Sequence, residues 1–153
     1  MTTPPLHLRA AHASDLALLG QLKLRASLAW GEHTERLRQL PDIDHVPHTA
    51  LPQLIVAERQ QRLVGFASVE LRPALSQAQL DDLFVEPDCW HQGIGTALLR
   101  AAEEHAHRLG ATELQLVANP KAQQFYTKQG YLFRTNIRTD FGIAPVLYKR
   151  LGT

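Results

Sequence analysis

The sequence predicts an α/β (α+β) fold of about seven strands and four helices. Residues 14–30 and 94–109 carry apolar residues at steps of three and four, which is typical of helices packed on one face. Short runs that are continuously apolar, or that alternate apolar with polar residues, predict the strands. The 153 residues are 44% hydrophobic and 20% charged, values typical of soluble globular proteins. A chain of this length and composition predicts one domain over residues 1–153.

The N-terminal third predicts one strand and two helices. Residues 6–10 alternate in polarity and indicate a half-buried strand. Ser14 stands where a helix N-cap is expected, which predicts a first helix ending near Trp30. A second helix is expected from about Glu32 to Leu40, where a proline stops it. Residues 41–53 contain three prolines and little periodicity, so we expect a loop there.

The middle of the chain predicts three strands. Leu54–Ala57 is a continuous apolar run, as expected for a strand covered on both faces. Residues 59–62 form the next turn, but they lack glycine and asparagine, so the turn type stays open. Leu63–Arg72 alternates between two faces and predicts a long strand. After a turn near Pro73 we expect a strand at Leu80–Val85.

The C-terminal part predicts a helix, a strand, a helix and two strands. The first helix follows two glycines, and four apolar positions recur at helical spacing: Leu98, Ala102, Ala106 and Leu109. Glu113–Ala118 is an apolar strand, and the helix after it is expected to carry both Asn119 and Tyr126 on a similar side. Residues 131–138 and 144–150 are expected to form an antiparallel pair.

Bulk composition excludes several classes of protein. Lys plus Arg number 16 against 15 for Asp plus Glu, so no overall field favours nucleic acid. A solitary Cys89 excludes an internal disulfide, and no run reaches the roughly 18 apolar residues of a membrane span. Residues 1–5 do not resemble a secretory signal. We therefore expect a cytoplasmic protein that binds neither nucleic acid nor membrane, and homodimer formation is left open.

The stretch that follows the strand at 80–85 is typical of an anion-binding loop. The strand stops before Pro87, a short polar segment follows, and Gly93 and Gly95 open a helix. The first turn of a helix has N–H groups without intrahelical partners, and glycines let an anion approach them without meeting a Cβ atom. This arrangement predicts a phosphorylated ligand.

Two motifs together resemble a known family. Residues 85–95 read Val-x-Pro-x5-Gly-x-Gly, and residues 119–131 read Asn-x2-Ala-x2-Phe-Tyr-x3-Gly-Tyr. In this order and spacing they resemble the GNAT superfamily of N-acetyltransferases, which transfer acetyl from acetyl-CoA to an amine. The resemblance covers nearly the whole chain. It implies a twisted mixed central sheet of about seven strands with helices on both faces.

The resemblance also implies where acetyl-CoA binds. The pantetheine arm would pair with exposed backbone of Leu83, Phe84 and Val85, and the pyrophosphate would lie on the loop formed by His91, Gln92, Gly93, Ile94, Gly95 and Thr96. Asn119 is expected to face the same cofactor arm. This sequence departs from the family at Trp90, where glutamine or arginine is usual, so the contribution of a side chain at that position stays open.

The implied chemistry is direct attack of a primary amine on the thioester of acetyl-CoA within a ternary complex, on a small molecule, peptide or protein acceptor. Tyr126 matches the family's tyrosine that donates a proton to the departing thiolate. We expect Asp82 to accept the proton of the amine. Asp81, Glu70 and water are alternatives, and Asp81 and Asp82 must face opposite sides of their strand.

Other readings of these residues are weaker. A dinucleotide fingerprint would need a glycine at Leu98 and an acid at Asn119. Cys89 has no His-carboxylate pair arranged in the sequence to activate it, so we expect an inert thiol. The eight histidines are not spaced as metal ligands, so no metal is expected.

Two rival functions remain. One is a non-catalytic acetyl-CoA-binding or sensing module, and the other is a structural or interaction domain. Stabilisation by acetyl-CoA would exclude the structural domain, and CoA release with an amine would exclude the sensor. The identity of the acceptor amine is not encoded in any recognisable pattern.

Overall fold

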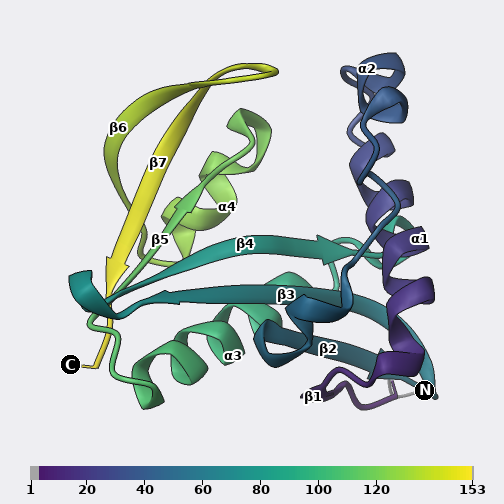
Figure 1. Ribbon diagram of the computed structural model, residues 1–153, viewed down its shortest axis with the longest axis horizontal. Helices are drawn as coiled ribbons and strands as arrows, with labels where there is room; N and C mark the ends of the chain where they lie inside the picture. Colours follow the sequence, from purple (N-terminus) through teal and green to yellow (C-terminus); the bar gives the residue numbers. More distant parts are fainter. Residues whose placement is uncertain (1–3, 153) are drawn as a thin grey trace. The chain divides into compact units, whose positions relative to one another are not determined.

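The structure, a computed structural model, describes residues 4–152 (Figure 1). The chain divides into two compact units. One unit comprises Met1–Ser68 and Asp82–Ala101, and the other comprises Val69–Asp81 and Ala102–Thr153. Residues 1–3 belong to the segment in which no secretory signal is predicted, and they lie outside the described residues. Among residues 4–152, no helix is both long and apolar enough to cross a membrane.

Seven strands form one mixed sheet. Their bounds are β1 (His7–Ala10), β2 (Leu54–Arg59), β3 (Arg62–Arg72), β4 (Gln77–Val85), β5 (Glu113–Val117), β6 (Leu132–Thr139) and β7 (Gly142–Arg150). The helices are α1 (Leu16–Leu28), α2 (Thr34–Gln39), α3 (Ile94–Arg108) and α4 (Gln123–Lys128). The strand order is β1-β2-β3-β4-β5-β7-β6, with parallel pairing between β4 and β5. The predicted α/β fold with about seven strands is therefore confirmed.

In the first unit, α1 covers one face of the strands (Figure 1). Its apolar side packs with residues of β2 and β3 into one cluster, whose fully or nearly fully buried members include Leu19, Leu22, Ala26, Leu54, Val56 and Phe66. The Phe66 ring also lies 5.6 Å from the ring of Phe84 on β4, centroid to centroid. Burial of these side chains is the main force that holds α1 on the strands.

The N-terminal part of α3 packs on the opposite face of β3. Gly65 precedes Phe66, and because neighbouring residues of a strand face opposite sides, Gly65 faces α3. A Cβ atom on Gly65 would lie 2.9 Å from Cδ1 of Leu98, 3.3 Å from Cγ2 of Ile94 and 2.9 Å from the carbonyl oxygen of Phe84. Only glycine lets the helix approach β3 this closely. Gly65 therefore fixes where α3 begins relative to the strands of its unit.

The turn between β2 and β3 is a two-residue hairpin turn with an unusual sequence. Arg59 pairs with Arg62, and the two residues between them have positive φ, 53° for Gln60 and 63° for Gln61. Positive φ at both central positions defines a type I′ turn, which asparagine and glycine favour. The turn whose type the sequence left open is therefore a type I′ turn, formed by two glutamines.

The start of the first helix differs from the prediction. A 3₁₀ turn at Ala13–Asp15 precedes α1; His12 is the N-cap of the turn and Asp15 is the N-cap of α1, so Ser14 caps neither. The Asp15 carboxylate accepts a 2.7 Å hydrogen bond from the His12 N–H and two more, of 2.8 and 3.2 Å, from the Arg9 guanidinium. The acid of the first turn, not the serine, therefore closes this helix start.

The predicted loop at 41–53 is partly helical, since His48–Gln53 forms a 3₁₀ helix that contains Pro52. The first half of this segment lies against α1 at Gly20, where an added Cβ atom would collide with the carbonyl oxygen of Asp44. Gly20 thus has a packing role in the middle of a helix. Glycine there costs helix propensity but permits the loop to approach.

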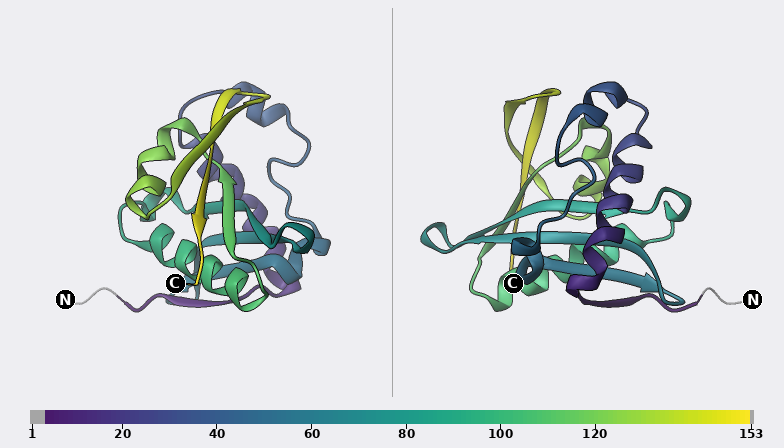
Figure 2. Two further views of the ribbon diagram at one scale, coloured as in Figure 1. Left: turned by 90° about the vertical axis from the view of Figure 1, so that its left-hand side faces the viewer. Right: turned by 45° about the vertical axis from the view of Figure 1, so that its right-hand side comes forward.

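In the second unit, β7 lies between β5 and β6 and is antiparallel to both (Figure 2). The parallel ladder of β4 with β5 runs from Gln77–Glu113 to Gln79–Gln115. Ala102 and Ala106 on α3 are fully buried, but Leu109 is 53% exposed. The prediction that Leu109 is a fourth position of that apolar face is wrong, because the helix ends at Arg108.

Candidate active site

The loop between β4 and α3 is open to solvent at its tip. A 3₁₀ turn at Pro87–Cys89 follows β4, and residues 91–93 are exposed. Gly93 has φ 81°, and a Cβ atom there would meet nothing within 4 Å. Its carbonyl accepts a 3.1 Å bond from the N–H of Ala97, so the helical hydrogen bonds begin at this glycine. The N-terminal end of α3 therefore opens on an exposed loop, where N–H groups without helical partners favour negative charge.

Trp90 is part of the internal support of this loop. Its indole N–H donates a 2.9 Å hydrogen bond to the carbonyl oxygen of Val85. Its ring lies 5.1 Å from the ring of Trp30 at an interplanar angle of 41°. The side chain that stands in place of the usual glutamine or arginine is thus engaged with the protein itself.

Two ion pairs hold the segment before the loop. The Glu86 carboxylate is 5% exposed and accepts bonds of 2.7 and 2.9 Å from the Arg25 guanidinium on α1. Asp88 accepts bonds of 3.0 and 3.1 Å from Arg62 on β3. The Arg25–Glu86 contact uses two nitrogens on two oxygens, which fixes geometry as well as charge, whereas one nitrogen of Arg62 donates to both oxygens of Asp88. The β4–α3 connection is therefore tied to the elements on both sides of it.

Cys89 lies in this segment, and its environment disfavours the thiolate. Burial raises the pKa of its thiol, and the neighbouring Asp88 carboxylate raises it further by accepting a 3.1 Å hydrogen bond from Sγ. A reactive cysteine needs a lowered pKa. The expected inert thiol agrees with this arrangement.

The backbone of β4 presents alternate residues to its two edges. The N–H of Glu86 donates a 2.8 Å hydrogen bond to the carbonyl of Val64 on β3. The N–H and C=O of one residue point to the same edge, and successive residues alternate. The backbone groups of Phe84 therefore also face β3, whereas those of Leu83 and Val85 point to the opposite edge.

The two adjacent aspartates of β4 differ in exposure. Asp81 is exposed, whereas Asp82 is half-buried and its carboxylate accepts a 2.7 Å hydrogen bond from the Ser68 hydroxyl on β3. Glu70 is exposed. The sequence did not predict Ser68 at the site. Its place beside Asp82 follows from the pairing register of β3 with β4, and that register cannot be counted across a turn whose length is uncertain.

The second motif folds differently from the single long helix expected. Asn119 has φ −59° and ψ 131°, outside the helical region, and its side-chain oxygen accepts a 2.9 Å bond from the N–H of Lys121. A 3₁₀ turn at Pro120–Ala122 then leads into α4. The expectation that Asn119 and Tyr126 share one helix face is wrong, because Asn119 caps the 3₁₀ turn.

Tyr126 lies in the second unit and is 9% exposed. Its ring makes edge contacts with the rings of Phe125 and Tyr131, at centroid distances of 5.0 and 5.8 Å. Burial raises the pKa of its phenol above the ordinary value of 10.0. The hydroxyl therefore stays protonated at neutral pH, which is the state a proton donor requires.

Tyr131 is held in place by ionic neighbours. Its hydroxyl donates a 2.8 Å hydrogen bond to the Glu103 carboxylate on α3, which also accepts a 3.1 Å bond from the Lys149 ammonium on β7. This network fixes the ring against which Tyr126 packs. Glu103 and Lys149 carry no motif signal, since their roles depend on contacts between distant segments.

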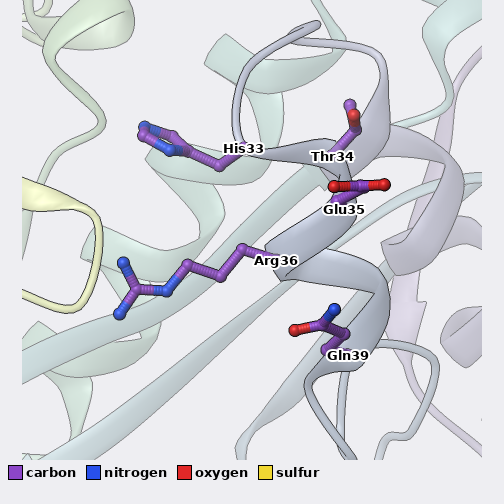
Figure 3. A pocket seen from close by; sticks show the side chains of 5 residues that line it. All are labelled: His33, Thr34, Glu35, Arg36 and Gln39. Carbon is purple, nitrogen blue, oxygen red and sulfur yellow. The ribbon is translucent and has the colours of Figure 1, made fainter.

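A cleft of about 670 Å³ lies along α2 in the first unit. Its lining side chains are those of His33, Thr34, Glu35, Arg36 and Gln39. In Figure 3, the imidazole of His33 and the guanidinium of Arg36 extend in the same direction from the helix. Two nitrogen-rich groups thus face one side of the cleft.

The predicted site residues fall in both units. Asp82, Leu83–Val85 and His91–Thr96 belong to the first unit, and Asn119 and Tyr126 belong to the second. Within residues 4–152, no group of three His, Cys, Asp or Glu side chains is arranged to hold a metal ion.

Solved structures resemble this chain along nearly its whole length. N-acetylglutamate synthase from Neisseria gonorrhoeae, complexed with coenzyme A and N-acetyl-glutamate, gives a TM-score of 0.76 at 17% identity, over 99% of this chain but 36% of that chain. A GCN5-related N-acetyltransferase from Rhodopseudomonas palustris gives 0.76 at 23% identity, over 99% and 98% of the two chains. The PaiA N-acetyltransferase from Thermoplasma acidophilum, in complex with coenzyme A, gives 0.71 at 21% identity, over 95% and 99%.

The sequence comparisons identify the family. A search of curated proteins returns no match. The model of the acetyltransferase (GNAT) family matches residues 21–131, which is more than half of the 153 residues. The structural likenesses, all below 25% identity, agree with this in fold. The chain therefore belongs to the acetyltransferase (GNAT) family and is an N-acetyltransferase.

Proposed function

We propose that this enzyme is a single-domain, cytoplasmic N-acetyltransferase that uses acetyl-CoA and acetylates a primary amine of a small molecule or peptide by direct attack in a ternary complex. The observation that carries the proposal is the exposed β4–α3 loop, where a positive-φ glycine leaves open space at the start of a 15-residue helix. Bound acetyl-CoA would supply an acetyl group activated as a thioester.

The residues present fit this cosubstrate. The proposed pyrophosphate site is the loop from His91 to Thr96, where a helix N-terminus favours negative charge. The proposed pantetheine contacts are the backbone groups of Leu83 and Val85, which point away from β3. Phe84 would contribute mainly through its side chain, since its backbone groups face β3. Asn119 is proposed to act by holding the turn that leads to α4, through the bond from Lys121 N–H.

Two side chains are proposed to move protons. A neutral amine must lose a proton as the new C–N bond forms, and Asp82, oriented by the Ser68 hydroxyl, accepts it directly or through a water. When the C–S bond breaks, Tyr126 donates its phenolic proton to the sulfur. The proton that Asp82 holds then restores, through solvent, the proton that Tyr126 gave up, so the net products are an amide and the thiol of coenzyme A.

The cleft along α2 is proposed to receive the acceptor. His33 and Arg36 extend toward the same side, which suits an amine that also carries a carboxylate (Figure 3). Arg36→Gln should raise KM for carboxylate-bearing amines by about 10-fold with little change in kcat, as expected for loss of one charged hydrogen bond. Arg38→Gln, an exposed arginine on the same helix, is the matched control and should leave KM unchanged.

The decisive test of the function combines binding with turnover. Calorimetry with acetyl-CoA should give binding to the wild type and none to Gly95→Glu, because the new side chain would clash with and repel the pyrophosphate. CoA release with a panel of amines, amino acids and peptides should identify the acceptor. Binding without release for any amine would support a sensing module instead, and equal affinity of the folded Gly95→Glu variant would remove the loop assignment.

A further inference from the structure

The β2–β3 hairpin places an arginine beside the β4–α3 loop. Arg59 is the last residue of β2, next to the strained two-glutamine turn. One terminal nitrogen of its guanidinium donates a 2.8 Å hydrogen bond to the side-chain oxygen of Gln92, at the exposed tip of the loop. Both residues belong to the first unit, so the contact is internal to one compact body.

Arg59 differs from three other arginines of its unit, because no carboxylate of the described residues pairs with its charge. In the same unit, Arg9 pairs with Asp15 and Glu58, Arg25 with Glu86, and Arg62 with Asp88. Within the part of the chain that the structure describes, Arg59 makes no ion pair, and its only hydrogen-bond acceptor is the neutral amide of Gln92.

The guanidinium of Arg59 also has a donor that no residue in the described range uses. Its Nε is buried and has no hydrogen-bond partner among residues 4–152. A buried donor without a partner is costly, and natural structures seldom leave one without a reason. Arg59 is thus a cation with unused donors beside the loop that is proposed to bind an anion. This arrangement suits the binding of an anionic group by Arg59.

We propose that Arg59 binds a phosphate group of coenzyme A and forms the side-chain wall of the loop's phosphate site. The inference rests on the proposed use of acetyl-CoA. A guanidinium binds phosphate with two parallel hydrogen bonds, which an amide oxygen cannot match. Gln92 holds the side chain in place before binding and gives up its bond to the phosphate. This basic residue lies outside the loop and supplies the charge that Trp90 does not.

The test measures binding by calorimetry, independently of turnover. Coenzyme A is titrated into the wild type, Arg59→Gln, Arg59→Lys and the exposed-arginine control Arg38→Gln. We expect Arg59→Gln to weaken binding about 10- to 100-fold, the worth of a charge-assisted hydrogen bond or two. Arg59→Lys should recover part of the loss, since it restores the charge but not the fork. Arg38→Gln should bind like the wild type.

A parallel titration with dephospho-CoA, which lacks the 3′-phosphate, assigns the phosphate. A loss with both ligands places Arg59 on the pyrophosphate, and a loss with coenzyme A alone places it on the 3′-phosphate; either supports the proposal. Wild-type affinity in Arg59→Gln, or an equal loss in Arg38→Gln, would overturn it. Failure of the wild type to bind coenzyme A would instead refute the proposed function. Melting temperatures confirm that each variant is folded.

Discussion

Trp90 donates its indole N–H to the carbonyl oxygen of Val85, at 2.9 Å, and so closes the connection between β4 and α3 on itself. The Trp90 ring also packs on the ring of Trp30, just after α1. The second lone pair of the Val85 oxygen stays available for a ligand. The loop is therefore shaped before any ligand arrives.

The first prediction is that Trp90→Phe loosens this loop. The substitution keeps an aromatic ring against Trp30 but removes the donor to Val85, which should cost about 1 kcal/mol of unfolding free energy. Affinity for acetyl-CoA should fall with it, because the loop must then be ordered by the ligand. Urea denaturation and calorimetry measure the two effects. Trp30→Phe keeps the hydrogen bond from Trp90 to Val85. If Trp30→Phe lost as much affinity for acetyl-CoA as Trp90→Phe, ring packing and not the hydrogen bond would be responsible.

The second prediction concerns the close approach of α3 to β3. Gly65→Ala places a methyl group 2.9 Å from Cδ1 of Leu98 and from the Phe84 carbonyl, which should cost about 1–3 kcal/mol of stability. Leu98→Ala alone should also destabilise, by leaving a cavity. In the double variant the methyl group gains room on the Leu98 side. Denaturation should therefore show a combined cost below the sum of the two, and simple additivity would contradict the proposed contact.

The third prediction is a pH dependence of stability due to Asp15. Hydrogen bonds from Arg9 are the main cause that lowers the pKa of this carboxyl below 3.8, and the His12 N–H adds to the effect. A lowered pKa in the folded state gives stability that is present above about pH 4 and is lost as the pH falls further. Asp15→Asn should cost about 1–3 kcal/mol at pH 7 and flatten the loss of stability between pH 5 and pH 2.

Glu104→Gln is the control for that measurement, since Glu104 is an exposed carboxyl on α3. It should keep the slope of the wild type. A slope in Asp15→Asn that is as steep as in the wild type would assign the acid sensitivity to other carboxyls.

The fourth prediction separates chemistry from packing at Tyr126. Tyr126→Phe keeps the buried ring and its contacts with Phe125 and Tyr131, so the fold should persist. The rate of acetyl transfer should fall by about 10²- to 10⁴-fold, the usual contribution of a positioned acid. Turnover and melting temperature are measured on the same preparation. A wild-type rate with only a shift in melting temperature would exclude Tyr126 from the reaction.

The same variant tests the raised pKa of Tyr126. Because the folded state holds the phenol neutral, the unfolded state ionises first as the pH rises above about 10, and stability is lost there. Tyr126→Phe should lose less stability between pH 9 and pH 11 than the wild type does. Tyr131, whose pKa burial also raises, remains in both proteins and sets the baseline.

The sequence predicted most of the fold because its signals are local. Local patterns located the four helices and seven strands found among residues 4–152, and the two glycines marked the start of α3 within a residue. Errors arose where contacts decide the structure. Ser14 is not a cap because a 3₁₀ turn, capped by His12, precedes α1. β4 begins at Gln77 rather than Leu80 because parallel pairing with β5 extends it.

Site prediction shows the same division between local and long-range signals. The motifs pointed to the loop at residues 91–96 and to Tyr126; the structure shows the loop exposed at its tip and Tyr126 buried, and the roles of both stay predictions. Ser68 beside Asp82 and Arg59 beside Gln92 could not be predicted, since each pair depends on a strand register that no single segment encodes. Asn119 was predicted to lie on a helix, but its side chain accepts a hydrogen bond from the Lys121 N–H and its backbone is not helical. Apolar periodicity carries no signal for such a bond.

The contact between the rings of Trp30 and Trp90 has a practical consequence. These are the two tryptophans of the chain, so its indole fluorescence originates at one location, and Trp90 directly precedes the loop that is proposed to hold the phosphates. Rings 5.1 Å apart are close enough to influence each other's emission, and any ligand that shifts the loop alters that coupling. The unlabelled wild-type enzyme therefore carries its own optical reporter, and stopped-flow emission can follow the arrival of the acetyl donor before the acceptor is known.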